Sequence, residues 1–237
     1  MTTAQGDPEV PTEAIARWKQ AEAHLGTAIG RLVEEDYDGP SLLPGWDRRH
    51  VLAHLARNAD AMVNLLTWAR TGVETPAYPS DEARDAGIAE TAQQEPKELE
   101  ADVLGGIARL AAAVKEMPPH AWAVQLRARQ GHAISAADVV WMRTREAYVH
   151  SVDLNSGVLF SDVPADVLAS IVDDVFRTWD RTDRVPDVVV FAGDREWGTG
   201  SVAVSGPMPD VAAWLTGRSE GDNLRADGDI PTVPAWT

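Results

Sequence analysis

Apolar residues recur every three, four or seven positions through much of the first 154 residues, which is the spacing of one buried face of an α-helix. The pattern predicts long helices over residues 12–33, 47–69, 96–117 and 136–154, and a shorter surface helix over 80–92. Residues that favour helix starts precede or open these segments: Thr12, Asp47, Pro96 and Ser135. Because the connections are short, we expect the long helices to pack antiparallel as a four-helix bundle.

The pattern changes after Gly157. Residues 164–179 and 209–215 have helical spacing, whereas 188–191 form a continuous β-rich run and 201–205 alternate. Gly198 and Gly200 lie between these two strands, which favours a hairpin, and 222–237 lack a pattern. We therefore predict an α+β fold with two domains, a helical bundle over 1–157 and a small α/β domain over 158–237. A loose alternation over 124–134 predicts a further hairpin inside the first domain.

Charge and hydropathy exclude several classes of function. The 237 residues carry a net charge of −16, so a general binder of phosphate backbones or anionic lipid surfaces is not expected. No apolar run approaches the ~18–20 residues of a membrane-spanning helix. The polar, acidic start lacks the features of a signal peptide, so we expect a cytoplasmic protein.

Cysteine is absent from the chain. Disulfides, cysteine-ligated zinc and a cysteine nucleophile are therefore excluded. If the protein carries out thiol chemistry, the thiol has to come from a bound small molecule.

Two pairs of possible metal ligands are each four residues apart, which is the spacing of one helix face. His50 and His54 share a face of the second long helix, and Glu146 and His150 share a face of the fourth, in a row that continues to Asp153. Burying a carboxylate and an imidazole is costly without a partner, and a divalent metal would satisfy both.

Ordinary structural interpretations of these residues stay open. A His pair at this spacing is common on surface helices, Glu146 could pair with Arg143 or Arg145, and His150 could be a hydrogen-bonded core histidine. Arg218, after the last short helix, could cap the helix dipole. Trp46 is more typical of core packing than of a site.

Several ordered motifs resemble those of the mycothiol-dependent maleylpyruvate isomerase family. The second-helix region contains SLLPGW at 41–46 and RHVLAH at 49–54, followed by LTWARTG at 66–72 and ETP at 74–76. The fourth helix contains WMRTRE at 141–146 and HSVDL at 150–154. The resemblance covers most of the chain and extends to Gly217-Arg218.

This resemblance implies a DinB-like four-helix bundle that binds a divalent metal, usually zinc, and a smaller C-terminal α/β domain. The family's three ligands correspond to His54, Glu146 and His150, whereas His50 corresponds to a family histidine that is not a ligand. Arg218 corresponds to an arginine important for activity. The implied partners are a small-molecule substrate and mycothiol as the low-molecular-weight thiol; the oligomeric state stays open, and a monomer is compatible with the sequence.

The resemblance also implies a reaction, the cis–trans isomerisation of maleylpyruvate to fumarylpyruvate in the breakdown of aromatic acids. A thiolate adds to the cis double bond, the resulting single bond rotates, and elimination gives the trans product, while Arg218 holds a substrate carboxylate or the enolate oxygen. Two alternatives remain at this point. One is a mycothiol S-transferase of the same superfamily, and the other is a non-enzymatic zinc-binding bundle.

Overall fold

The computed structural model describes residues 10–236. The chain forms two compact units, of which the first ends at Gly157 and the second begins at Val158. Helices are combined with two small sheets, which confirms the predicted α+β class. Among the described residues, no helix is both long and apolar enough to cross a membrane.

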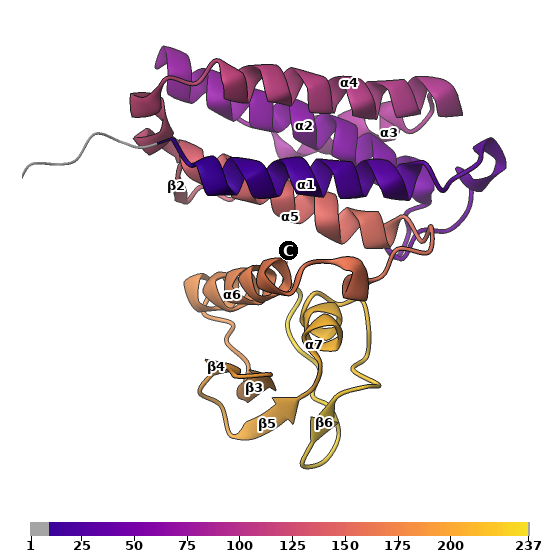
Figure 1. Ribbon diagram of the computed structural model, residues 1–237, viewed down its shortest axis with the longest axis vertical. Coiled ribbons are helices and arrows are strands. Elements are labelled where there is room, and N and C mark those ends of the chain that lie inside the picture. Colours follow the sequence, from indigo (N-terminus) through magenta and orange to yellow (C-terminus); the bar gives the residue numbers. More distant parts are fainter. Residues whose placement is uncertain (1–9, 237) are drawn as a thin grey trace, which may run out of the picture. The chain divides into compact units, whose positions relative to one another are not determined.

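Long helices dominate the first unit (Figure 1). They are α1 (Thr12–Ile29), α2 (Arg48–Thr71), α4 (Pro96–Lys115) and α5 (Ala136–Asp153), with a shorter helix α3 (Asp81–Thr91) beside α2. Helix α2 packs against both α4 and α5, and α1 packs against α5. Their facing sides are lined by fully buried leucines such as Leu25, Leu55 and Leu99, each of which contributes ~1.5–3 kcal/mol on burial.

Several predicted helix starts are confirmed. The Asp47 side chain accepts a hydrogen bond from the backbone N–H of His50 at 2.9 Å, and Ser135 forms a capping box with Asp138. Pro96 occupies the first turn of α4. The first helix differs from its prediction, because Thr12 is already helical, while the helix ends at Ile29 rather than near residue 33. Gly30 follows Ile29, and the chain then forms the 3-10 turn η1 (Glu34–Asp36).

A short hairpin leads into α5. After the 3-10 helix η2 (Pro119–Ala123), strand β1 (Gln125–Arg127) pairs antiparallel with β2 (Ala133–Ser135), which confirms the hairpin predicted over 124–134. Leu126 and Ile134 are opposite each other in the register, and both are buried in the hydrophobic core of the first unit.

The second unit combines helices with a four-stranded sheet (Figure 1). Its helices are η3 (Phe160–Asp162), α6 (Ala165–Arg181) and α7 (Met208–Leu215), and α6 packs against α7. The strands lie in the order β4–β3–β5–β6, with bounds Arg195–Gly198, Val188–Ala192, Val202–Ser205 and Arg225–Ala226. Strand β6 lies within the segment that was expected to be irregular.

The predicted hairpin between residues 188–191 and 201–205 is wrong. Strand β3 pairs antiparallel with β4, which was not predicted, and parallel with β5. Gly198 and Gly200 are needed for a different reason than a hairpin turn. A Cβ at Gly200 would come within 2.0 Å of the Val188 backbone nitrogen, and one at Gly198 within 2.4 Å of its carbonyl oxygen. These glycines therefore allow the chain to pass close to the start of β3.

Candidate metal centre

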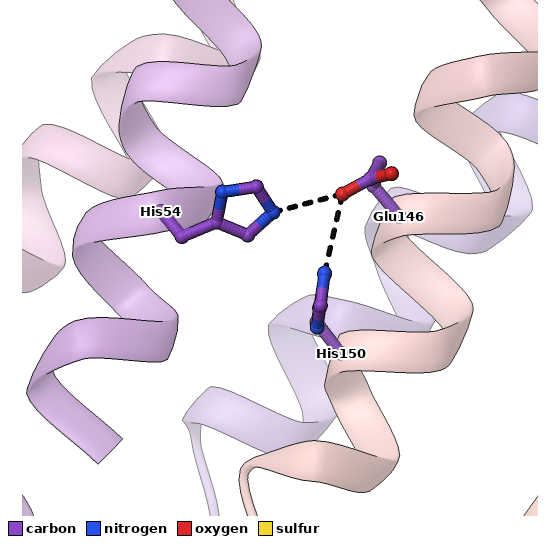
Figure 2. Close-up of side chains that lie close together, drawn as sticks. All are labelled: His54, Glu146 and His150. Atoms are coloured by element: carbon purple, nitrogen blue, oxygen red, sulfur yellow. Dashed lines mark hydrogen bonds and ion pairs between the residues drawn. The ribbon is translucent and has the colours of Figure 1, made fainter. Parts of the chain in front are cut away.

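Helices α2 and α5 bring together three of the residues singled out in the sequence (Figure 2). His54 extends from α2 toward Glu146 and His150, which lie one turn apart on α5. The Glu146 Oε2 atom is 2.8 Å from His54 Nε2 and 3.1 Å from His150 Nε2. One ligand atom from each residue lies within 4.8 Å of the other two, so the spacing of Glu146 and His150 does place both on the face that meets His54.

All three side chains are largely removed from solvent. The exposed fraction is 8% for the His54 side chain, 17% for Glu146 and 12% for His150. Such polar groups are stable in a protein interior only when they are paired or bind a metal. Two imidazole nitrogens and a carboxylate oxygen form a donor set that suits Zn²⁺ and related divalent metals. The residues present therefore fit the metal that the sequence motifs imply.

Burial and hydrogen bonding act in opposite directions on the protonation of this group. Burial lowers the pKa of His54 to about 4, although its hydrogen bond to Glu146 opposes the shift. Burial alone would raise the pKa of Glu146, but the hydrogen bonds from His150 and His54 outweigh it and hold this pKa well below the ordinary value. Glu146 is therefore ionised and His54 neutral at pH 7, which are the forms that bind metals.

His150 is oriented by a second carboxylate. The Asp153 side chain is fully buried, and its Oδ2 atom is 2.8 Å from His150 Nδ1. Burial alone would lower the pKa of His150, but the hydrogen bonds to Asp153 and Glu146 outweigh it and raise this pKa. A carboxylate that binds one imidazole nitrogen directs the other toward a metal. The sequence placed Asp153 in the same helical row and assigned it no role.

The alternative ion pairs of Glu146 are only partly present. Arg145 Nη2 lies 3.3 Å from Glu146 Oε1, which leaves Oε2 to both imidazoles. Arg143 does not pair with Glu146. It is fully buried and binds Glu22 of α1 instead, a partner 121 positions away that helical spacing cannot indicate.

Trp46 and His50 precede His54 at the start of α2. His50 Nδ1 lies 2.7 Å from Asp47 Oδ1, and His50 is not part of the three-residue group. The Trp46 ring lies 5.7 Å from the His54 ring, centroid to centroid, and is only half-buried. The expectation of core packing is therefore wrong for Trp46, which lies against a residue of the site.

Arg218 belongs to the second unit, just beyond α7. Gly217 adopts a left-handed conformation with φ +77°, and the backbone N–H of Arg218 donates to the Ala213 carbonyl at 2.7 Å. The half-buried guanidinium donates to the Thr216 carbonyl. These bonds are the ones expected of a residue that ends a helix.

Comparison with known proteins identifies the family. A family model described as the mycothiol maleylpyruvate isomerase N-terminal domain matches residues 4–155. The chain belongs to this family. Solved structures of mycothiol-dependent maleylpyruvate isomerase and of a histidine-to-alanine mutant of it are each 30% identical to the chain. Each match has a TM-score of 0.91 and covers 95% of this chain and 96% of the other.

No match was found among curated proteins. The family model covers the first unit with its His54–Glu146–His150 group, and the structural matches extend over nearly the whole chain. The resemblance stated from the sequence motifs is thereby confirmed. Both solved structures are of isomerases, so the comparisons do not favour the S-transferase or the non-enzymatic bundle.

Proposed function

We propose that this protein is a mycothiol- and divalent-metal-dependent cis–trans isomerase that converts maleylpyruvate to fumarylpyruvate. The observation that carries the proposal is the convergence of His54, Glu146 and His150 in the interior of the unit that matches the isomerase family. The proposal extends to the architecture. Helices α1, α2, α4 and α5 constitute a DinB-like antiparallel four-helix bundle that is the metal-binding domain, and residues 158–237 constitute a small α/β domain.

His54, Glu146 and His150 are the ligands in this proposal, and zinc is the first choice of metal. Three protein ligands leave coordination positions open, as in catalytic zinc sites, whereas structural sites are normally closed. When bound, the metal favours the thiolate form of the mycothiol thiol, which adds reversibly to the cis double bond. The chain has no cysteine that could supply this thiolate itself.

The chain's own residues prepare this site before the reaction. The depressed pKa of His54 keeps its imidazole neutral at pH 7, so it holds an electron pair available for a metal. Asp153 holds the Nδ1 side of His150 at 2.8 Å and turns Nε2 toward Glu146. Burial of all three side chains limits access of bulk water, which strengthens the electrostatic interactions within the site.

Arg218 is the proposed substrate-binding residue. Maleylpyruvate carries two carboxylates, and a chain with net charge −16 has to offer a local positive group to attract it. A guanidinium matches a carboxylate with two parallel hydrogen bonds and can also stabilise an enolate oxygen. We also propose that the enzyme acts in the cytoplasm on small molecules alone, without a nucleic-acid or membrane partner.

A pair of histidine variants tests the metal centre. His54→Ala removes one proposed ligand, and His120→Ala removes an exposed histidine of η2. We expect His54→Ala to lose zinc on dialysis and to lose turnover of maleylpyruvate, measured by absorbance in the presence of mycothiol. His120→Ala should keep both. Full turnover by metal-free His54→Ala protein would disprove the proposed centre.

A further inference from the structure

Arg143 is a charged side chain in the middle of the helical unit, and its side chain is fully buried. Its Nε and Nη2 atoms donate to the two carboxylate oxygens of Glu22 at 2.7 and 3.3 Å. Its Nη1 atom donates to the Leu55 carbonyl at 2.8 Å and to Asn58 Oδ1 at 3.0 Å. A single guanidinium therefore joins helices α1, α2 and α5 in the core.

Stability alone does not explain this pair. Taking two charges out of water costs about as much as their attraction returns, and apolar pairs of similar volume often leave stability unchanged or increase it. The carboxylate is held further by Trp18, whose Nε1 donates to Glu22 Oε1 at 2.8 Å. Such a network, in which the guanidinium donates to acceptors on two other helices, defines the geometry of the helices that it joins.

The position of the network relates it to the candidate metal centre. Leu55, which accepts from Arg143, directly follows His54 on α2. Arg143 itself lies three residues before Glu146 on α5, which is less than one helical turn. A shift of α2 along α5 would separate His54 from Glu146 and would also break the bond between Arg143 and the Leu55 carbonyl. The bond from Arg143 to the Leu55 carbonyl therefore restrains the distance between His54 on α2 and Glu146 on α5.

We propose that Arg143 is a positioning residue for the metal centre. Glu22 neutralises and orients its guanidinium, and its bond to the Leu55 carbonyl sets the relative position of His54 on α2 and of Glu146 and His150 on α5. The inference rests on the proposed function, because it assumes that these three residues bind a metal. It assigns a role in metal binding to a residue pair outside the proposed ligand set.

A double variant separates positioning from stability. Glu22→Gln with Arg143→Met removes both buried charges together, and the Gln oxygen can still accept from Trp18. Because no unpaired charge is left in the core, we expect a melting temperature close to that of the unaltered chain. Affinity for Co²⁺, used as a spectroscopic probe, should fall by about 10-fold or more, as is typical when groups that orient metal ligands are lost. The visible absorption spectrum of the bound Co²⁺ should also change.

Two further variants serve as controls. Arg143→Lys keeps the charge and loses the planar fork, so it should weaken Co²⁺ binding in the same direction even if the double variant does not fold. Leu99→Ala opens a cavity at a fully buried position of α4 and should lower the melting temperature without changing the Co²⁺ spectrum.

The outcomes distinguish the inference from the proposal beneath it. Folded double-variant or Arg143→Lys protein with the affinity and spectrum of the unaltered chain would overturn the positioning role while leaving the metal centre intact. Failure of the unaltered chain to bind Co²⁺ would overturn both. A spectral change in Leu99→Ala as large as that in Arg143→Lys would also contradict the inference, because any loss of stability would then suffice.

Discussion

Replacement of Asp153 by Asn tests whether the Asp153 carboxylate orients the His150 imidazole in the candidate metal centre. Asp153 is fully buried, and its Oδ2 atom accepts the Nδ1–H of His150 at 2.8 Å. Asn has nearly the same shape and can present an amide oxygen at the same place, so the fold should tolerate the change. What is lost is the negative charge that holds the His150 imidazole in one orientation and raises its basicity.

The expected loss of zinc affinity follows from the hydrogen bond between Asp153 and the proposed ligand His150. Loss of a group that orients a metal-bound histidine typically lowers metal affinity 10- to 100-fold, which corresponds to about 1.4–2.8 kcal/mol. We expect a decrease in this range for Asp153→Asn, measured as the zinc Kd by competition with a chromophoric chelator. Turnover at saturating zinc should fall less than affinity, because Asp153 contacts the histidine rather than the substrate.

Asp47→Asn is the matched control. Asp47 also binds a histidine three residues away on a helix, at 2.7 Å, but its partner His50 is not a proposed ligand. This control should keep the zinc Kd within about twofold of the unaltered chain, and the start of α2 should stay capped because Asn caps helices about as well as Asp. Equal zinc affinity in the Asp153→Asn variant and the unaltered chain would refute the reasoning, as would an equal loss in both variants.

Three further predictions concern the metal, the substrate and the helix packing. Chelation should abolish turnover, and zinc at 100 times its Kd should raise the stability of the metal-free protein by about 2.7 kcal/mol in thermal or urea unfolding, with activity restored in parallel. Arg218→Lys keeps the charge but loses the bidentate fork, so kcat/KM for maleylpyruvate should fall about 10- to 100-fold with the zinc Kd unchanged; equal kcat/KM would argue against a substrate contact. Gly106→Leu should lower the free energy of unfolding by about 1–3 kcal/mol in urea, because a Cβ at Gly106 would lie 3.0 Å from the Cβ of Ala59. Gly105→Ala should raise the free energy of unfolding by about 0.5–1 kcal/mol, because its Cβ would meet only the flexible Arg109 guanidinium.

Local periodicity predicts the helices of this chain well, because each helix buries one stripe of apolar residues. The same reasoning placed Glu146 and His150 on one face and identified Asp47 and Ser135 as helix caps, since these interactions span three or four residues. The choice of His54 rather than His50 came from motif resemblance and not from spacing, because both histidines lie on the same side of α2.

Interactions between distant segments were the ones that sequence could not predict. Helical spacing offered Glu146 as one open partner for Arg143, but three-dimensional packing brings Glu22 to it across 121 residues. Strand β5 pairs parallel with β3 instead of forming a hairpin, because the unpredicted strand β4 occupies the antiparallel edge. Trp46 is a large apolar residue of the kind that usually packs in a core, and only the turn before α2 places its ring against His54. In each case the local pattern is compatible with several partners, and the tertiary fold selects one.

The most direct test of the account is the consumption of maleylpyruvate by the purified protein, followed by absorbance with and without mycothiol and with and without zinc. The account predicts isomerisation to fumarylpyruvate only when both the thiol and the metal are present, loss of activity after chelation, and recovery when zinc is added back. Absence of turnover by protein that has bound zinc, in the presence of mycothiol, would contradict the proposed reaction, and equal turnover without the thiol would contradict the proposed mechanism.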